Sequence, residues 1–202
     1  MLLIDIGNVV IWDPRPLIVR EILRTERVDP DRLRRSYYRV ALRMAAGSLR
    51  LPGAYRELRA RFHWSMSYRA FRELVGRRAL RPIPGVLPAL RALHRKGTVR
   101  IVYASNVEPA TWAGLRRKFR LDDCADGAAL SFRLRSLKPS RRFFRGAIRI
   151  ARVAPATMVY LDDLPENIRA ARALGIRARR VRSPEDTLAV LRTLRAGRPR
   201  GG

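Results

Sequence analysis

The sequence predicts a three-layer α/β fold, in which a parallel sheet carries helices on both faces and a block of helices is inserted near the start of the chain. Two observations predict this fold class. Short apolar segments alternate with helical ones from about residue 81 to residue 196, which is the pattern of parallel sheets. Between residues 14 and 80 the alternation stops, and only helical patterns occur.

Three parts of the chain follow from this pattern. Residues 1–13 and 81–196 are predicted to form the core, residues 14–80 a helical cap, and residues 197–202 a disordered tail. The chain of 202 residues has the length of one core domain with a modest insert. Its 47% of hydrophobic residues suit a sizeable buried core.

The first strand is predicted over residues 2–10, an apolar and β-branched stretch that Gly7 and Asn8 bring to an end. The predicted cap follows with four helical patterns. The second of them begins after Asp29, a capping residue with Pro30 at the first helical position. The four segments are residues 15–27, 29–47, 52–64 and 67–78.

The remaining elements alternate between strand and helix. Gly175 closes one helix, and Ser183 is the capping residue of the last one. Strands are predicted at residues 99–106, 124–131, 157–163 and 176–182; helices are predicted up to Gly97 and over residues 110–119, 140–152, 166–175 and 183–196.

Polar side chains lie at the ends of three predicted strands. Asp5 interrupts the first strand, Ser105 and Asn106 end the second, and Asp162 and Asp163 end the fourth. A buried carboxylate is costly unless a partner or a metal ion compensates its charge. Because the carboxyl ends of parallel strands meet at one edge of a sheet, these side chains are predicted to face a common ligand.

Lys138 lies in a loop that leads into a predicted helix. It is one of three lysines, with Lys96 and Lys118, while the other 41 of the 44 basic residues are arginines. A compact ammonium group suits the oxygens of a phosphoryl group. Two or three neighbouring carboxylates suit Mg²⁺. Together these groups indicate phosphoryl-transfer chemistry.

Taken in chain order, these groups resemble the four motifs of the haloacid dehalogenase-like (HAD) hydrolase superfamily, over nearly the whole chain. The segments DIGNVV, SNVE, LKPS and LDDLPENIRAARALG resemble the helical-cap branch that includes bacterial α-D-glucose-1-phosphate phosphatases. The resemblance implies a Rossmann-like sheet with the strand order five-four-one-two-three. The motifs are Asp5 to Val9, Ser105 with Asn106, Lys138 with Pro139, and Asp162 with Asp163 followed by Asn167.

The resemblance also implies a role for each residue. Asp5 would be the nucleophile that forms an aspartyl-phosphate. The Asp5 carboxylate, the Gly7 carbonyl and Asp163 would hold Mg²⁺, with Asp162 as a further ligand or as a support of the ligands. Ser105 and Asn106 would bind phosphate oxygens. Lys138 would neutralise charge on Asp5 and on the phosphoryl group. Asn167 would orient the lysine or the acidic pair, and residues 14–80 would exclude water and select the substrate.

One position departs from the usual family pattern. Phosphatases of this kind usually carry a second aspartate two residues after the nucleophile, which acts as general acid and base. This chain has Gly7 there, so the backbone carbonyl is kept and the acid/base group is absent. A leaving group of low pKa, such as an anomeric oxygen, needs less proton donation, which agrees with a sugar 1-phosphate as substrate.

The formal net charge of +27 would attract nucleic acid or other polyanions. The arginines are dispersed from Arg15 to Arg200, so we favour a compositional bias and expect a small phosphorylated molecule as the partner, with nucleic acid less favoured. No secretory leader or membrane span is expected, which predicts a cytoplasmic protein. The sequence shows no signal for an oligomeric state.

Simpler interpretations apply to some of these residues. Asp5 and the acidic pair could cap turns or helices, and Ser105 with Asn106 could form an ordinary strand-end turn. His63 and Trp64 in the cap fit packing better than substrate contact, and Cys124, the only cysteine, fits a buried position.

Two other functions are open at this point. A 2-haloacid dehalogenase also uses an aspartate nucleophile, but it needs no metal ion and normally has tyrosine at the position of Gly7. The second is a non-catalytic protein of the same fold that binds nucleic acid or an acidic partner. The intact acidic pair favours a Mg²⁺-dependent phosphatase acting on a small phosphorylated metabolite.

Overall fold

The sheet has five parallel strands in the order β3-β2-β1-β4-β5. The computed structural model describes residues 1–197. The observed order is the one that the family resemblance implies. The strands are β1 (Leu2–Ile4), β2 (Ile101–Ser105), β3 (Gly127–Leu130), β4 (Val159–Asp162) and β5 (Arg177–Arg180).

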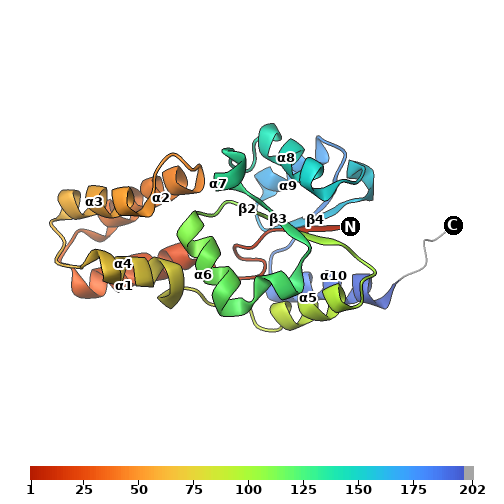
Figure 1. Cartoon of the computed structure of the whole chain (residues 1–202), viewed down its shortest axis with the longest axis horizontal. Coiled ribbons are helices and arrows are strands. Elements are labelled where there is room, and N and C mark those ends of the chain that lie inside the picture. The colour runs from red at the N-terminus through yellow and green to blue at the C-terminus, as the bar shows by residue number, and fades with distance from the viewer. Residues whose placement is uncertain (198–202) are drawn as a thin grey trace.

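Alternate side chains of the strands pack on opposite faces of the sheet, because successive residues of a strand point to opposite sides. Leu2 and Ile4 belong to a cluster with α5, α6 and α10. Leu3 belongs to a second cluster with α8 and α9. The predicted three-layer arrangement is therefore confirmed (Figure 1).

The helices of these two layers lie close to their predicted positions. One short helix, α7, was not predicted; it directly follows β3 and replaces the end of the predicted strand 124–131. The elements are α5 (Val86–Arg95), α6 (Pro109–Phe119), α7 (Ser131–Leu134), α8 (Arg141–Ala151), α9 (Pro165–Arg172) and α10 (Pro184–Ala196), with 3₁₀ turns η2 (Leu121–Cys124) and η3 (Pro155–Thr157).

A cap-like group of helices lies beside the sheet (Figure 1). It has a hydrophobic cluster of its own, to which Tyr37, Val40 and Met44 contribute. As predicted, Asp29 caps a helix: its carboxylate accepts a hydrogen bond from the Arg32 backbone at 2.6 Å. The elements are α1 (Pro14–Thr25), α2 (Pro30–Ala45), α3 (Leu51–Phe62), α4 (Tyr68–Glu73) and a π-helical turn η1 (Leu74–Arg78).

The two segments that connect this group to the sheet are paired with each other. The Trp12 backbone N–H donates to the Arg81 carbonyl, and the Ile83 N–H donates to the Val10 carbonyl, both at 3.0 Å. The pairing places the first helices over the carboxyl ends of the strands.

The first strand is shorter than predicted. It ends at Ile4, and the Ile6 carbonyl accepts hydrogen bonds from the N–H groups of Val10 and Ile11, both at 2.9 Å. These bonds fold residues 6–11 into a turn, in which Asn8 has a left-handed backbone with φ of 54°. Asparagine tolerates this conformation better than most residues.

The last helix of the described residues is α10, and Gly197 is its C-terminal capping residue. The rest of the predicted tail lies outside the described residues. Within residues 1–197, every helix is too short or too polar to cross a lipid bilayer.

Candidate active site

A cavity of about 310 Å³ lies between the strand ends and helices α1 and α2. Its walls include most of the residues that the sequence singles out. Because these come from separate parts of the chain, the sheet brings together the side chains that the motifs predict. The predicted site residues in the lining are Asp5, Gly7, Ser105, Asn106, Lys138, Asp163 and Asn167.

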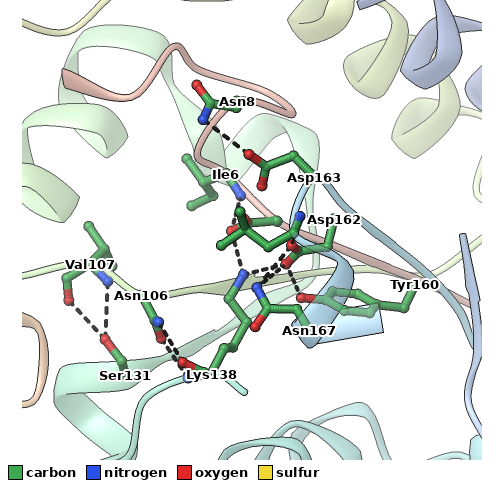
Figure 2. A network of polar contacts seen from close by, with 12 residues as sticks. Ile6, Asn8, Asn106, Val107, Ser131, Lys138, Tyr160, Asp162, Asp163 and Asn167 are labelled. Carbon is green, nitrogen blue, oxygen red and sulfur yellow. Dashed lines mark hydrogen bonds and ion pairs between the residues drawn. The ribbon is translucent and has the colours of Figure 1, made fainter. Parts of the chain in front are cut away.

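Lys138 lines this cavity and lies between the carboxylates of Asp5 and Asp162; Figure 2 shows its contact with Asp162. Its Nζ is 2.8 Å from Asp5 Oδ1 and 2.7 Å from Asp162 Oδ2, and the lysine side chain is only 1% exposed. Burial acts to lower the pKa of Lys138, but the two carboxylates raise it above its ordinary value. The ammonium group is therefore held charged at neutral pH.

Asp162 is saturated with hydrogen bonds. Its side chain is fully buried, and it accepts hydrogen bonds from Lys138, the Leu164 N–H at 2.8 Å, Asn167 Nδ2 at 2.9 Å and the Tyr160 hydroxyl. Burial acts to raise its pKa, yet Lys138 and these donors hold the pKa below the ordinary value. Of its two predicted roles, ligand or support, these contacts favour the support of Lys138.

Tyr160 is a site residue that sequence reasoning missed. A signal was present, because residues two apart on a strand share a face and Tyr160 precedes Asp162 by two positions in β4. The Asn167 amide donates to both oxygens of Asp162, the carboxylate that contacts the lysine (Figure 2).

Asp5 directly follows β1 and presents its two oxygens differently. Oδ1 accepts a hydrogen bond from the Ile6 N–H at 2.7 Å and forms an ion pair with Lys138, whereas none of the described residues donates to Oδ2. Burial raises the pKa of Asp5 to about 7, although Lys138 acts to lower it. The carboxylate is thus held in place by one oxygen and has the other available.

Asp163 lies beside Asp5 at the cavity wall and is half-buried. Its Oδ2 accepts a hydrogen bond from Asn8 Nδ2 at 3.1 Å (Figure 2). Burial raises the pKa of this carboxyl above its ordinary value. The sequence did not predict this role of Asn8, which depends on its left-handed turn conformation.

The structure gives the Asn106 side chain a partner that the sequence did not predict. Its Nδ2 donates to the Lys138 carbonyl at 3.0 Å, and its Oδ1 accepts from the Lys138 N–H at 2.8 Å. Both ends of the amide therefore fix the backbone of the lysine. In contrast, the Ser105 hydroxyl has no hydrogen-bond partner among residues 1–197 and lines the cavity. Buried Ser131, also missed, holds the neighbouring loop by hydrogen bonds with the backbone of Val107.

The acidic side chains fit a hard divalent cation. One oxygen from each of Asp5, Asp162 and Asp163 lies within 4.8 Å of the others. Among residues 1–197, Lys138 is the cation that forms ion pairs with these carboxylates, while Arg180 Nε donates to the backbone carbonyl of Asp163 at 2.9 Å. Three carboxylates and one ammonium leave two negative charges when all are ionised. Gly7 lines the same cavity, and its carbonyl accepts no hydrogen bond within the described part of the chain. Oxygen donors of this kind suit Mg²⁺.

The sequence matches the family model of the haloacid dehalogenase-like hydrolases over residues 2–175. The chain belongs to this family. No curated protein matches the sequence of this HAD-like hydrolase.

Solved structures share the fold of this HAD-like hydrolase at low sequence identity. The magnesium complex of the HAD family enzyme bt-2542 from Bacteroides thetaiotaomicron has a TM-score of 0.80 and 20% identity, over 95% of this chain and 97% of that one. A predicted HAD-like family hydrolase from Porphyromonas gingivalis has a TM-score of 0.73 and 16% identity, over 96% of both chains. The L-2-haloacid dehalogenase from Xanthobacter autotrophicus has a TM-score of 0.65 and 16% identity, over 99% of this chain and 84% of that one.

A larger cavity of about 930 Å³ lies between the cap-like helices and α6. Its charged residues are mainly arginines, and its acidic residues are Glu73 and Glu108. Arginine is abundant everywhere in this chain, so the number of arginines here follows from composition. This cavity lacks the combined lysine and carboxylates of the smaller one. The arginines are Arg50, Arg69, Arg72, Arg77, Arg117 and Arg135.

The raised pKa of Asp5 predicts that Asp5→Asn stabilises the metal-free protein at pH 8. The folded protein holds the Asp5 proton up to about pH 7, whereas the unfolded chain loses it near the ordinary value of 3.8. The contribution of Asp5 to the free energy of unfolding therefore falls as pH rises from about 4 to 7. Asparagine resembles the protonated form of aspartate, so we expect the free energy of unfolding to rise by about 4 kcal/mol at pH 8 and to change little near pH 4.

Chemical denaturation in the presence of a chelator, at pH 4, 6 and 8, measures this difference. The exposed carboxylate Asp31 provides the control, because Asp31→Asn should give no comparable dependence on pH. An Asp5→Asn protein that is less stable than the wild type at pH 8 would contradict the prediction.

Proposed function

We propose that this HAD-like hydrolase is a Mg²⁺-dependent phosphatase that acts on a small phosphorylated metabolite through an aspartyl-phosphate intermediate. The observation that carries the proposal is the position of Lys138, which bridges Asp5 and Asp162 beside a third carboxylate. A phosphoryl group next to Asp5 would find a fixed positive charge and a nucleophilic oxygen at the floor of one cavity.

Asp5 performs the first step. A carboxylate oxygen of Asp5 attacks phosphorus and forms the acyl-phosphate bond, while the ester P–O bond breaks and its electron pair leaves with the alcohol oxygen. Oδ2 suits this attack because it has no protein donor, while Oδ1 is fixed by Ile6 and Lys138. Lys138 stabilises the charge on the transferring group, and the Ser105 hydroxyl is free to donate to a phosphoryl oxygen.

The second step restores the enzyme. Water attacks the phosphorus of the aspartyl-phosphate, the acyl-phosphate P–O bond breaks, and inorganic phosphate is released with the Asp5 carboxylate regenerated. One proton of the attacking water stays on the phosphate, and the other passes through solvent to the alkoxide released in the first step. Throughout, Asp162, Asn167 and Asn106 keep the lysine in position. The cap-like helices exclude bulk water from the cavity.

Mg²⁺, when bound, would supply positive charge that offsets the carboxylates and the phosphoryl oxygens. Asp5, Asp163 and the Gly7 carbonyl would hold it, with Asp162 supporting through Lys138. Two complexes of bt-2542 contain magnesium and inorganic phosphate, which supports this choice of cofactor and chemistry.

Phosphate release from a panel of phosphate monoesters, with Mg²⁺ and with a chelator, tests the proposal. We expect release that requires Mg²⁺. Chloride release from a 2-chloro acid without any metal would favour the dehalogenase function instead, in line with the dehalogenases among the structural neighbours. Absence of both activities, with salt-sensitive binding of nucleic acid, would favour the non-catalytic alternative.

Replacing Gly7 by aspartate is expected to raise the turnover of alkyl phosphates by about 10²-fold, because it supplies a general acid and base. The site has room for it: a Cβ at Gly7 would have no atom within 4 Å, and the backbone is outside the left-handed region. Steady-state rates for an alkyl phosphate and p-nitrophenyl phosphate measure the effect. The p-nitrophenyl ester needs little protonation, so its rate should change less than about threefold; Gly7→Ala is the matched control.

A further inference from the structure

Three large hydrophobic side chains stand out because they are exposed. Within residues 1–197 they are Trp12, Leu42 and Leu164, with 45%, 48% and 44% of their surface accessible. All three line the cavity that contains Asp5 and Lys138. Single exposed leucines are ordinary, but exposed apolar groups gathered at one cavity indicate a ligand contact.

These side chains come from separate elements. Trp12 lies in the segment that enters the cap-like helices, Leu42 lies on α2, and Leu164 follows β4 next to the acidic pair. They extend an apolar wall that Ile18 and Ala41 continue inside the cavity. A ligand held between the strand ends and α2 would therefore bury apolar surface on both sides.

The charged groups on the cap side are already paired. Arg15 Nη2 is 2.8 Å from Asp13 Oδ2, and Arg15 Nε donates to Asp13 at 2.9 Å. Glu108, which directly precedes α6, accepts a hydrogen bond from the Thr111 hydroxyl. Among the described residues, the cap side of this cavity therefore offers no unpaired cation for a second phosphate.

Tyr37 adds a hydroxyl group to this wall. Tyr37 is only 1% exposed and lines the cavity. Its hydroxyl has no hydrogen-bond partner in the described part of the chain. It could pair with one polar atom of a largely apolar ligand.

The chemistry of the leaving group also favours an aromatic substrate, in agreement with the apolar lining of the cavity. Gly7 provides no acid to protonate the departing oxygen. A phenol, with a pKa of about 10 as in the tyrosine side chain, leaves as an anion far more easily than an alkyl alcohol does. An aromatic ring would also contact Trp12 favourably.

We infer that the substrates are aryl phosphates, monophosphate esters of an uncharged aromatic alcohol, whose ring lies between Trp12, Leu42 and Leu164. This inference rests on the proposed phosphatase function and specifies its substrate class. It replaces the sugar 1-phosphate that the family resemblance implied.

Steady-state kinetics with phenyl phosphate, 1-naphthyl phosphate and glucose 1-phosphate test the inference. We expect kcat/KM for 1-naphthyl phosphate to exceed that for glucose 1-phosphate by at least about 10-fold. Trp12→Ala, Leu42→Ser and Leu164→Ser should each raise KM for 1-naphthyl phosphate by about 5- to 20-fold, and should reduce its advantage over phenyl phosphate, which has a similar leaving group and less apolar surface.

Leu188→Ser is the matched control, because Leu188 is a partly exposed leucine on α10 outside this cavity. A second readout needs no turnover: binding of 1-naphthyl phosphonate should be weakened by the three cavity variants and not by the control. Efficient turnover of glucose 1-phosphate that the cavity variants leave unchanged would overturn the inference while the phosphatase function stands. Absence of phosphate release from every ester would overturn both.

Discussion

Asp5→Asn is expected to reduce Mg²⁺-dependent phosphate release by at least about 10⁴-fold, because the amide cannot attack phosphorus and cannot form the acyl phosphate. The neighbouring groups should change little, since Asn has the shape of Asp and its carbonyl oxygen can still accept hydrogen bonds from Ile6 and Lys138. Continuous phosphate detection with wild type and variant at saturating substrate measures the loss.

Trapping of the intermediate separates a lost nucleophile from a damaged fold. Acid-quenched wild type should carry hydroxylamine-sensitive phosphate on Asp5, and the variant should carry none. Asp31→Asn, at an exposed position on α2, should retain wild-type rates. Release by Asp5→Asn within 10-fold of wild type would mean that another group attacks phosphorus.

Lys138→Met is expected to lower both stability and turnover, because it leaves the buried carboxylates of Asp5 and Asp162 without their counter-ion. Breaking a buried ion pair from one side typically costs about 3–5 kcal/mol, which for a chain of this size lowers the melting temperature by about 10 °C or more. Turnover should also fall by about 10²- to 10³-fold, since the lysine is the fixed positive charge beside the phosphoryl group. Thermal unfolding at pH 8 and steady-state kinetics measure the two losses.

A double variant tests the cause of the instability. Adding Asp162→Asn to Lys138→Met removes one of the two uncompensated charges, so part of the lost stability should return while turnover stays low. The reason is that Asp162 is fully buried and depends on Lys138 for its charge balance. A Lys138→Met protein as stable as the wild type would contradict the arrangement in Figure 2.

Part of the site could be predicted from the sequence because it depends on local patterns. Asp5, Ser105 and Asp162 each lie at the end of an apolar strand, and parallel strands bring such ends to one edge. The two covering layers are as the pattern predicts, and the strand order is the one that the family resemblance implies. The length of the first strand was predicted less well, because the turn after Ile4 depends on hydrogen bonds to Ile6 that composition does not reveal.

The partner of each polar group could not be predicted in the same way. Asn106 and Ser105 are adjacent, yet one amide fixes the backbone of Lys138 while the neighbouring hydroxyl faces the cavity. Asp162 and Asp163 are also adjacent, and β4 directs the first into the buried network and the second toward Asn8. Adjacent residues at a strand end point in different directions, so their roles differ even where a motif treats them as a pair.

The sequence by itself determined the fold class, the order of the motifs and the set of side chains gathered at one edge of the sheet, because periodicity and strand-end chemistry are local properties. Only the tertiary structure decided that Trp12, Leu42 and Leu164 surround one cavity, that Arg15 is already paired, and that Asp162 supports the lysine. These facts depend on contacts between segments far apart in the chain, and such contacts are fixed only when the cap-like helices pack over the strand ends.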